Sequence, residues 1–369
     1  MATGKVQVNN LNLGQGPITE IERHLLFIGR GGSVDEESQL YSVNAQTDIT
    51  EQFADSALRD QLLAAQLNAG QNWTAAVYPL AEAETLLDAI DRANEVQSFE
   101  GVVICDVQNT PESLSAIHDH CYGLTAKLGR WCWALVAVPG IDDAAQTWAQ
   151  YEAAMATLQD GLAAHLVVPV PQLHGNNAGV LAGRLCNRAV SIADSPMRTA
   201  TGAVLGLGSA PSDSSGEPLS LATIETLANA RYSLPQWYPD FEGTYWTDAS
   251  TLDAVGGDYQ VLENLRVVHK ASRQVRILAI RRVADRVLNS TPNSIEMNKG
   301  YFMRPLRQMS KSYTILGIQF PGDIEPPKEG DITIEWPSKY AVVIYMVVRP
   351  YNSPKSITVN IALDLRNPV

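Results

Sequence analysis

Residues 101–107 read GVVICDV, and Thr110-Pro111-Glu112 follow after two residues. A short, unbroken apolar run predicts a strand that is buried on both faces. Proline is favoured in the first turn of a helix, and apolar residues then recur at helical spacing as far as Leu128. The stretch therefore predicts a buried strand followed by a helix that covers it.

The same alternation of buried strand and amphipathic helix extends from residue 24 to about residue 195. The expected strands are 24–29, 73–80, 101–107, 131–138 and 165–170. The expected helices are 58–70, 86–93, 110–128, 148–162 and 177–192. This order predicts a largely parallel sheet of about five strands with helices on both faces, an α/β sandwich.

After Pro196 the pattern changes. A linker rich in Ser, Pro and Gly covers 209–218, and an aromatic stretch with two prolines covers 232–246. A long basic helix is expected from about 259 to 288, and strands at 313–320, 331–336 and 341–349. The fold class is thus α/β plus α+β, a multi-domain chain. Its expected parts are an N-terminal arm (1–20), the sandwich (21–197), a linker (198–220), an α+β domain (221–355) and a C-terminal arm (356–369).

Both ends of the chain carry short segments of strand-like alternation. Residues 357–365 read ITVNIALDL, with a large aliphatic residue at every odd position. Burying such a side chain contributes about 1.5–3 kcal/mol. Ordering each backbone residue costs about 1–2 kcal/mol, so the arm needs a sheet edge supplied by something else. Two such arms favour interlocking with other subunits. The expected anchors are Val6, Val8, Leu11, Leu13, Ile357, Val359, Ile361 and Leu363.

Composition narrows the possible functions. The 369 residues are 45% hydrophobic and 18% charged, which is ordinary for a globular protein. A net charge of −13 argues against non-specific binding to nucleic acid or an anionic membrane. The first twenty residues hold no apolar segment typical of a signal peptide. The four cysteines show no CxxC spacing, so we expect buried free thiols in a reducing cytoplasm.

Three patterns could carry chemistry, and each has a simpler interpretation. The turn Gly29–Gly32 follows a strand and could approach a phosphate, but it lacks GxGxxG spacing and the P-loop lysine. On a helix, His118 and His120 point about 200° apart and cannot share one ion with Cys121. Asp106, Asp142 and Asp143 lie near strand ends, where caps are commoner than catalytic acids. No catalytic site, metal or cofactor is predicted.

The expected basic helix has an uneven charge. From 262 to 288 there are seven basic and two acidic residues in an otherwise acidic chain. Arg266, Lys270 and Arg273 follow i, i+4, i+7 spacing and share a face, with Arg276 nearby. The run is either a solvated face or a surface that docks on an acidic partner.

The opening MATGKVQVNNLNLGQG and the segment IERHLLFIG at 21–29 resemble the start of contractile-tail sheath proteins of tailed bacteriophages, most closely the Mu-like prophage group. The order of parts agrees over most of the length, through the basic helix ending Arg281-Arg282-Val283 to the C-terminal arm. The Arg-Thr-Asp…Pro-Ala-Asn signature of larger phage sheaths is missing.

The resemblance implies a non-enzymatic structural subunit. Such subunits form hexameric rings stacked helically around a tail tube, with arms completing sheets in neighbouring subunits, and contract when the baseplate triggers them. The partners implied are other copies of the chain, the tube protein, the baseplate and the tail terminator. The α+β domain would be tube-proximal, with Arg266, Lys270, Arg273 and Arg276 as tube contacts. The alternatives are a cytoplasmic α/β enzyme or nucleotide-binding protein using Gly29–Gly32, or another tail component.

Overall fold

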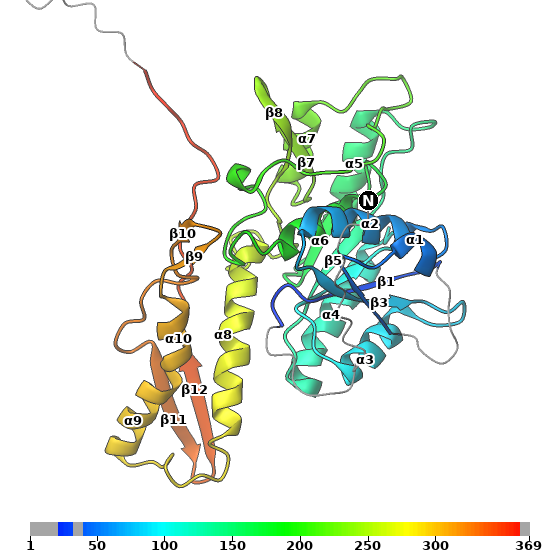
Figure 1. The fold of residues 1–369 in the computed structure, drawn as a ribbon. Helices are drawn as coiled ribbons and strands as arrows, with labels where there is room; N and C mark the ends of the chain where they lie inside the picture. Colours follow the sequence, from blue (N-terminus) through cyan, green and yellow to red (C-terminus); the bar gives the residue numbers. More distant parts are fainter. Residues whose placement is uncertain (1–20, 32–39, 362–369) are drawn as a thin grey trace, which may run out of the picture.

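The computed structural model describes residues 21–31 and 40–361, and a six-stranded sheet forms the centre of its larger part (Figure 1). The strand order is β2-β3-β1-β4-β5-β6, and only β2 runs antiparallel to its neighbour. The strands are β1 (Leu25–Gly29), β2 (Tyr41–Asn44), β3 (Thr74–Pro79), β4 (Gly101–Ile104), β5 (Trp133–Val138) and β6 (Val167–Pro171). The five predicted parallel strands are confirmed, and β2 is an additional edge strand.

Helices cover both faces of this sheet. On one face α2 (Ala57–Ala69) packs against α6 (Asn177–Cys186), and on the other α3 (Leu86–Val96) packs beside α4 (Pro111–Leu128). The α2–α6 contact is close because α6 carries small residues. A Cβ at Gly179 would lie 2.1 Å from the backbone oxygen of Gln61. The sandwich architecture predicted from the alternation is therefore present.

The α6 helix is shorter than predicted. It ends at Cys186 instead of Ile192, because the backbone of Asn187 is extended. The Asn187 side chain accepts a hydrogen bond from the Ala189 N–H at 2.9 Å, a local bond that competes with helix continuation.

A smaller lobe packs beside the sheet on the side of β6. It contains α5 (Trp148–Gln159), α7 (Leu221–Asn229) and a hairpin of β7 (Pro235–Tyr238) and β8 (Phe241–Trp246). The aromatic stretch at 232–246 thus forms a β-hairpin. The remaining short elements before α8 are α1 (Ile49–Gln52) and η1 (Thr199–Thr201).

The helix α8 (Leu262–Ile280) belongs to two hydrophobic cores. Leu262 and Leu265 in its first turn join the core of the α/β sheet. Val267, Ala271 and Val275 belong to a second core, which continues as far as Ile334. Such cores are clusters of side chains and do not by themselves set domain limits, so the domain limits given above stay a prediction.

The end of α8 differs from the prediction. The helix stops at Ile280 and not near Leu288, because residues 281–284 form a turn in which Ala284 has a φ of 60°. Arg282 closes this turn by donating to Asp285 at 2.6 Å.

The second core lies between α8, two further helices and a hairpin (Figure 1). These are α9 (Pro292–Phe302), α10 (Arg304–Met309), β11 (Ile332–Ser338) and β12 (Ala341–Met346). Neither helix was predicted, although Thr291 before Pro292 is a recognisable helix start.

The segment predicted as one strand at 313–320 is a second small hairpin, of β9 (Tyr313–Ile315) and β10 (Ile318–Phe320). Leu316 and Gly317 between them have φ values of 47° and 83°. Such a pair with positive φ matches the twist of a two-residue hairpin turn.

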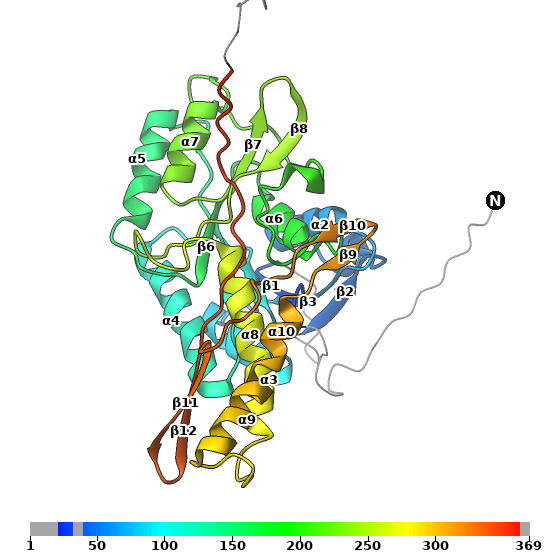
Figure 2. The same ribbon diagram turned by 90° about the vertical axis from the view of Figure 1, so that its left-hand side faces the viewer.

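The chain returns from β12 toward the start of α8 and leaves as an extended segment (Figure 2). Its last backbone contacts are the Ile324–Pro350 bridge and a bond from the Glu325 N–H to the Arg349 carbonyl at 2.8 Å. Residues 351–361 follow without regular secondary structure and are all exposed.

Candidate functional site: the C-terminal arm and the charged helix

The described part of the C-terminal arm exposes its apolar side chains. Ile357, Val359 and Ile361 are 76%, 74% and 92% exposed. Residues 357–361 pair with no strand of the described chain. The predicted anchors Val6, Val8, Leu11, Leu13 and Leu363 lie outside the described residues. The inter-subunit role of both arms stays a prediction.

Arg266, the first of the four predicted tube contacts, is enclosed. Its side chain is 2% exposed and makes a two-pronged contact with Glu100, which is fully buried. The Nε and Nη2 atoms of Arg266 donate to the two carboxylate oxygens at 2.6 and 2.9 Å. Burial by itself would raise the pKa of Glu100, but the charge and hydrogen bonds of Arg266 lower it below its usual value. This ion pair ties α8 to the segment before β4.

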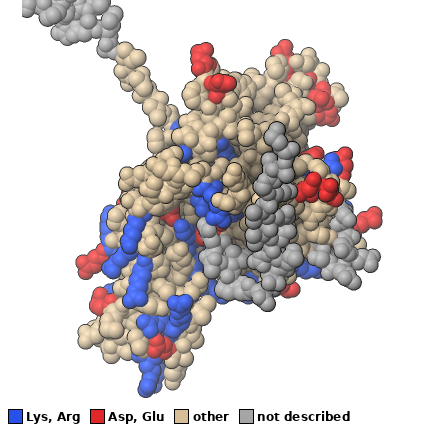
Figure 3. All heavy atoms as spheres, viewed as in Figure 1, with Lys and Arg blue, Asp and Glu red and all other residues tan. Residues whose placement is uncertain are grey.

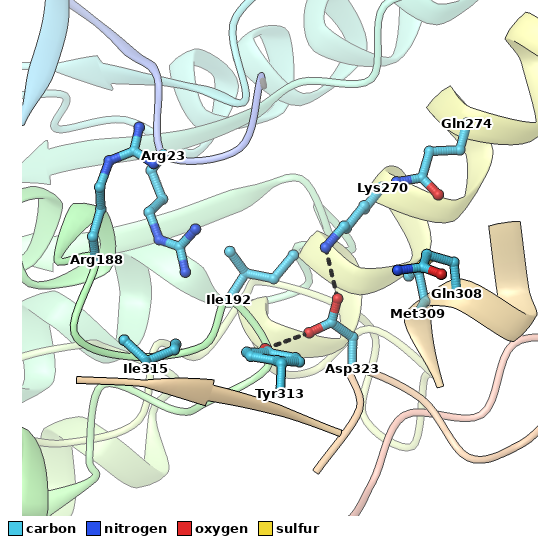
Figure 4. A pocket seen from close by; sticks show the side chains of 10 residues that line it. All are labelled: Arg23, Arg188, Ile192, Lys270, Gln274, Gln308, Met309, Tyr313, Ile315 and Asp323. Atoms are coloured by element: carbon cyan, nitrogen blue, oxygen red, sulfur yellow. Dashed lines mark hydrogen bonds and ion pairs between the residues drawn. The ribbon is translucent and has the colours of Figure 1, made fainter. Parts of the chain in front are cut away.

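Lys270 is paired with Asp323 beside a cavity of about 430 Å³ (Figure 4). Its Nζ lies 2.7 Å from Asp323, which also accepts from the Tyr313 hydroxyl at 2.8 Å and the Ser191 hydroxyl at 3.2 Å. Arg23 and Arg188 line the opposite wall. Asp323 therefore connects α8, the β9–β10 hairpin and the loop after α6.

Arg273 and Arg276 differ in exposure. Arg273 is 8% exposed, donating to Glu22 at 2.9 Å and to the Trp131 carbonyl at 3.1 Å. Arg276 is exposed, but its guanidinium lies against Gly129 at the end of α4. In this conformation Arg266 and Arg273 offer no free cation to a partner. The tube-contact role predicted for all four residues stays a prediction.

From Arg276 to Lys311 the chain carries six exposed cations, here called the basic cluster. Residues 276–311 contain eight basic and two acidic residues. Figure 3 shows Lys and Arg side chains gathered over the part of the molecule that holds α9 and α10. The exposed members are Arg276, Arg281, Arg286, Arg304, Arg307 and Lys311. This surface can meet an acidic partner without breaking the buried ion pairs of α8.

The β11–β12 hairpin is a two-stranded sheet, so each strand has one hydrogen-bonded neighbour. Its inner face includes Ile332 and Ile334, which are buried. Its outer face presents Val343 and Tyr345, which are 38% and 52% exposed. An unpaired strand edge is a template for another strand.

The turn that follows β1 is occupied by the chain itself. The Asp106 carboxylate, just beyond β4, accepts from the Arg30 N–H at 2.9 Å. This N–H is one that a phosphate would need, and the carboxylate would repel a phosphate. Gly32 lies outside the described residues.

The other candidate chemical groups have structural partners. His118 accepts from the Leu166 N–H at 3.3 Å, and His120 lies 3.0 Å from Asp91. Asp142 accepts from the Ala144 N–H at 3.0 Å as a turn cap. All four cysteines are buried free thiols, as predicted. Within 21–31 and 40–361, no three His, Cys, Asp or Glu residues group as metal ligands would, and no helix is long and apolar enough to cross a membrane.

Sequence reasoning missed the acidic partners Glu22, Glu100 and Asp323. They lie 251, 166 and 53 residues from the cations that they hold. No local spacing links residues so far apart. An acid next to a buried strand, as at Glu100, was the only signal available.

Comparisons with known proteins agree over the whole chain. The N-terminal domain model of the DUF2586 family matches residues 3–250, and the C-terminal domain model of the same family matches 258–366. A protein described as "Putative tail sheath protein" from Haemophilus phage HP1 (strain HP1c1) is 48% identical over an alignment 369 positions long, which covers 98% of each chain.

Solved structures share the fold. The helical sheath of the anti-feeding prophage in its contracted state superposes with a TM-score of 0.58 at 13% identity, covering 99% of both chains. The sheath tail protein of Listeria innocua gives 0.56 at 8% identity, covering 90% of this chain and 93% of that one. The chain therefore belongs to the DUF2586 family and is a tail sheath protein, a non-enzymatic structural subunit of a phage or phage-like contractile tail.

Proposed function

We propose that the chain polymerises by exchanging its terminal strands with neighbouring subunits. The observation that carries this proposal is the extended segment 357–361, whose three aliphatic side chains are exposed at alternating positions. Burying each side chain against a partner would contribute about 1.5–3 kcal/mol to the free energy of assembly. Val6, Val8, Leu11 and Leu13 would act in the same way at the other end.

The β11–β12 hairpin is the candidate acceptor. An isolated two-stranded hairpin is marginally stable, and adding strands at its edges extends its sheet. Its inner residues already pack on α9, so an incoming arm would extend an existing core layer. Strand addition would therefore bury the apolar face of the arm and give the edge of the hairpin a hydrogen-bonded neighbour.

Assembly would give hexameric rings stacked helically around a tail tube, linked by the arms during contraction. The subunit resides in the virion tail, and we propose that the tail is assembled in the host cytoplasm. The support is the resemblance of its opening segment and its fold-level likeness to a contracted sheath. The tube protein, the baseplate and the tail terminator would be its other partners. The sandwich and the tube-proximal domain would then rearrange as units.

The tube-facing surface would be the basic cluster around the C-terminal end of α8. Arg276 is the member of the predicted set that is exposed. Lys270 is half-buried against Asp323, and Arg266 and Arg273 are enclosed, so their contact with a tube would require opening of their ion pairs. Arg276 and its exposed neighbours are therefore the stronger candidates.

Removing Ser356–Val369 tests strand exchange directly. The truncated chain should fold, because residues 356–361 are exposed and belong to neither core. It should form no tubes or rings under conditions in which the full chain does, as judged by negative-stain electron microscopy and sedimentation. Sheath-like tubes from the truncated chain would refute the proposal.

A matched pair of variants distinguishes the effect of losing the apolar face from the effect of shortening the chain. Replacing Ile357, Val359 and Ile361 by Ser should abolish tubes, because it removes the face that would be buried. Replacing Thr358 and Asn360 by Ser leaves that face intact and should preserve them.

A further inference from the structure

The segment that leads into the C-terminal arm is tied to the body by one side chain, that of Lys355. Residues 351–361 are exposed to solvent. The Lys355 side chain, however, turns back toward the body and is only 32% exposed. In this described segment, the hydrogen bonds and ion pairs to the rest of the molecule are those of Lys355. The arm thus has a definite point of departure.

Two separate segments hold Lys355, and a third contacts it indirectly through Asp248. Its Nζ donates to both carboxylate oxygens of Asp248, at 2.6 and 2.7 Å, and to Glu263. Asp248 follows β8 and also accepts from the Ser195 hydroxyl at 2.7 Å. Glu263 lies in the first turn of α8. The contact therefore joins the segment before the arm directly to the end of β8 and to α8. Through Asp248 it also reaches the loop after α6.

The two carboxylates need this cation. Glu263 is 6% exposed, and its Oε2 atom has no hydrogen-bond partner in the described chain. Burial and the nearby charge of Asp248 raise the pKa of Glu263 to about 7, against the opposing effect of Lys355. Burial lowers the pKa of Lys355, but the two carboxylates together raise it above its usual value. Without Lys355, two acids would face each other in a partly dry site.

The position of Lys355 along the chain determines how long the free segment of the arm is. The last backbone contacts before it are at Arg349 and Pro350. With Lys355 bound, the free described segment is 356–361, and without it the free segment is 351–361. The longer tether alone would lower the effective concentration of the arm about 2.5-fold, by the −3/2 power of length. Ordering the additional residues during assembly would oppose binding further.

We propose that Lys355 is a positioning residue for assembly: by holding Asp248 and Glu263, it sets where and in which direction the C-terminal arm leaves the subunit. The proposal rests on the proposed exchange of arms. Pro350 and Pro354, which both precede Lys355, restrict the backbone between the two attachment points. The arm is thereby presented to a neighbour from a fixed origin.

The first experiment measures arm mobility in the full chain. A spin label on Thr358→Cys reports arm motion, and labelling is selective because the four native thiols are buried. Lys355→Met should shorten the rotational correlation time severalfold, and Lys355→Arg should leave it near the parent value. Lys311→Met, which removes the same charge from an exposed position elsewhere, is the control. An unchanged correlation time in Lys355→Met would overturn the proposal.

The second experiment measures assembly. Lys355→Met should raise the protein concentration at which tubes form by at least about 2.5-fold from the longer tether, and further because residues 351–355 must also be ordered. If Lys355 acts through Asp248, adding Asp248→Asn to Lys355→Met should bring little further change. An unchanged assembly concentration would overturn the positioning role. Tube formation by the chain truncated at Ser356, with mobility still dependent on Lys355, would instead refute arm exchange.

Discussion

The first half of α8 and the basic cluster that begins at Arg276 use the same kind of side chain for different purposes. From Leu262 to Arg273, its cations have acidic partners inside the molecule, namely Glu100, Asp323 and Glu22. From Arg276 onward the arginines are mostly exposed. A single basic run in the sequence therefore contains cations that form internal ion pairs and cations that lie on the surface. Residue type and helical spacing do not distinguish the two, because the partners come from other parts of the chain.

The energetic consequences of changes in the first half of α8 and in the basic cluster differ as well. Removing one member of a buried ion pair leaves an uncompensated charge and costs about 3–5 kcal/mol. Substituting an exposed charged residue usually changes stability by about 0.5 kcal/mol or less. Mutations in the first half should therefore affect folding, and mutations past Arg276 should affect interactions with partners.

The largest effect is expected at Arg266. Arg266→Met should lower the free energy of unfolding by about 3–5 kcal/mol, because Glu100 would stay buried without its cation. Urea unfolding followed by circular dichroism measures this loss. Arg281→Met, at an exposed position, should stay within about 0.5 kcal/mol of the parent.

A second variant shows whether the loss comes from the unpaired charge. Adding Glu100→Gln to Arg266→Met removes that charge and keeps an acceptor for the Arg23 N–H. More than half of the lost stability should return. If the double variant is as unstable as the single one, lost packing and not charge explains the effect.

A smaller effect is expected from His269, which is buried in the first half of α8. Burial and the nearby charge of Arg273 lower its pKa from 6.5 to about 3. The folded state therefore resists protonation, and this contribution to stability is present above pH 6.5 and is lost as the pH falls toward 3. Between pH 7 and pH 5, the loss from this group is about 2 kcal/mol.

His269→Gln should reduce the difference in unfolding free energy between pH 7 and pH 5 by about 2 kcal/mol. Glu263 works in the opposite direction, since its pKa is raised to about 7 and its contribution is lost as the pH rises through that value. It is present in both proteins, so the comparison isolates His269. An identical pH dependence in the two proteins would contradict the assignment.

The smallest effect on the subunit itself is expected in the basic cluster. Replacing Arg281 and Arg286 by Glu should leave the unfolding free energy nearly unchanged. It should weaken co-sedimentation with tail tubes about tenfold, most strongly at low salt, because exposed charges are screened. Self-assembly of the sheath should persist.

The control carries the same charge change on the sandwich, at Arg92 and Lys127, which are 59% and 57% exposed. Reversing these two should not affect tube binding. Equal tube binding by both double variants would show that the basic cluster is not the tube-facing surface.

Much of the fold was predictable from local pattern. Buried parallel strands such as β4 read as apolar runs, and α4 shows its start at Thr110-Pro111. The edge strand β2 was missed because its four residues, Tyr41–Asn44, show too little alternation to identify. The extension of α8 to Leu288 was wrong because Val283 and Val287 continue the apolar pattern past the turn at residues 281–284.

The sequence by itself determined the α/β alternation, the apolar face of the C-terminal arm and the concentration of basic residues around α8. Each of these depends on neighbours within a few residues, where backbone geometry and side-chain period act directly. Only the tertiary structure decided that Arg266 is a buried partner of Glu100, and that Lys355 is held by Asp248 and Glu263. Those contacts join residues 92 to 166 positions apart. Their existence depends on how the whole chain packs, which no local pattern specifies.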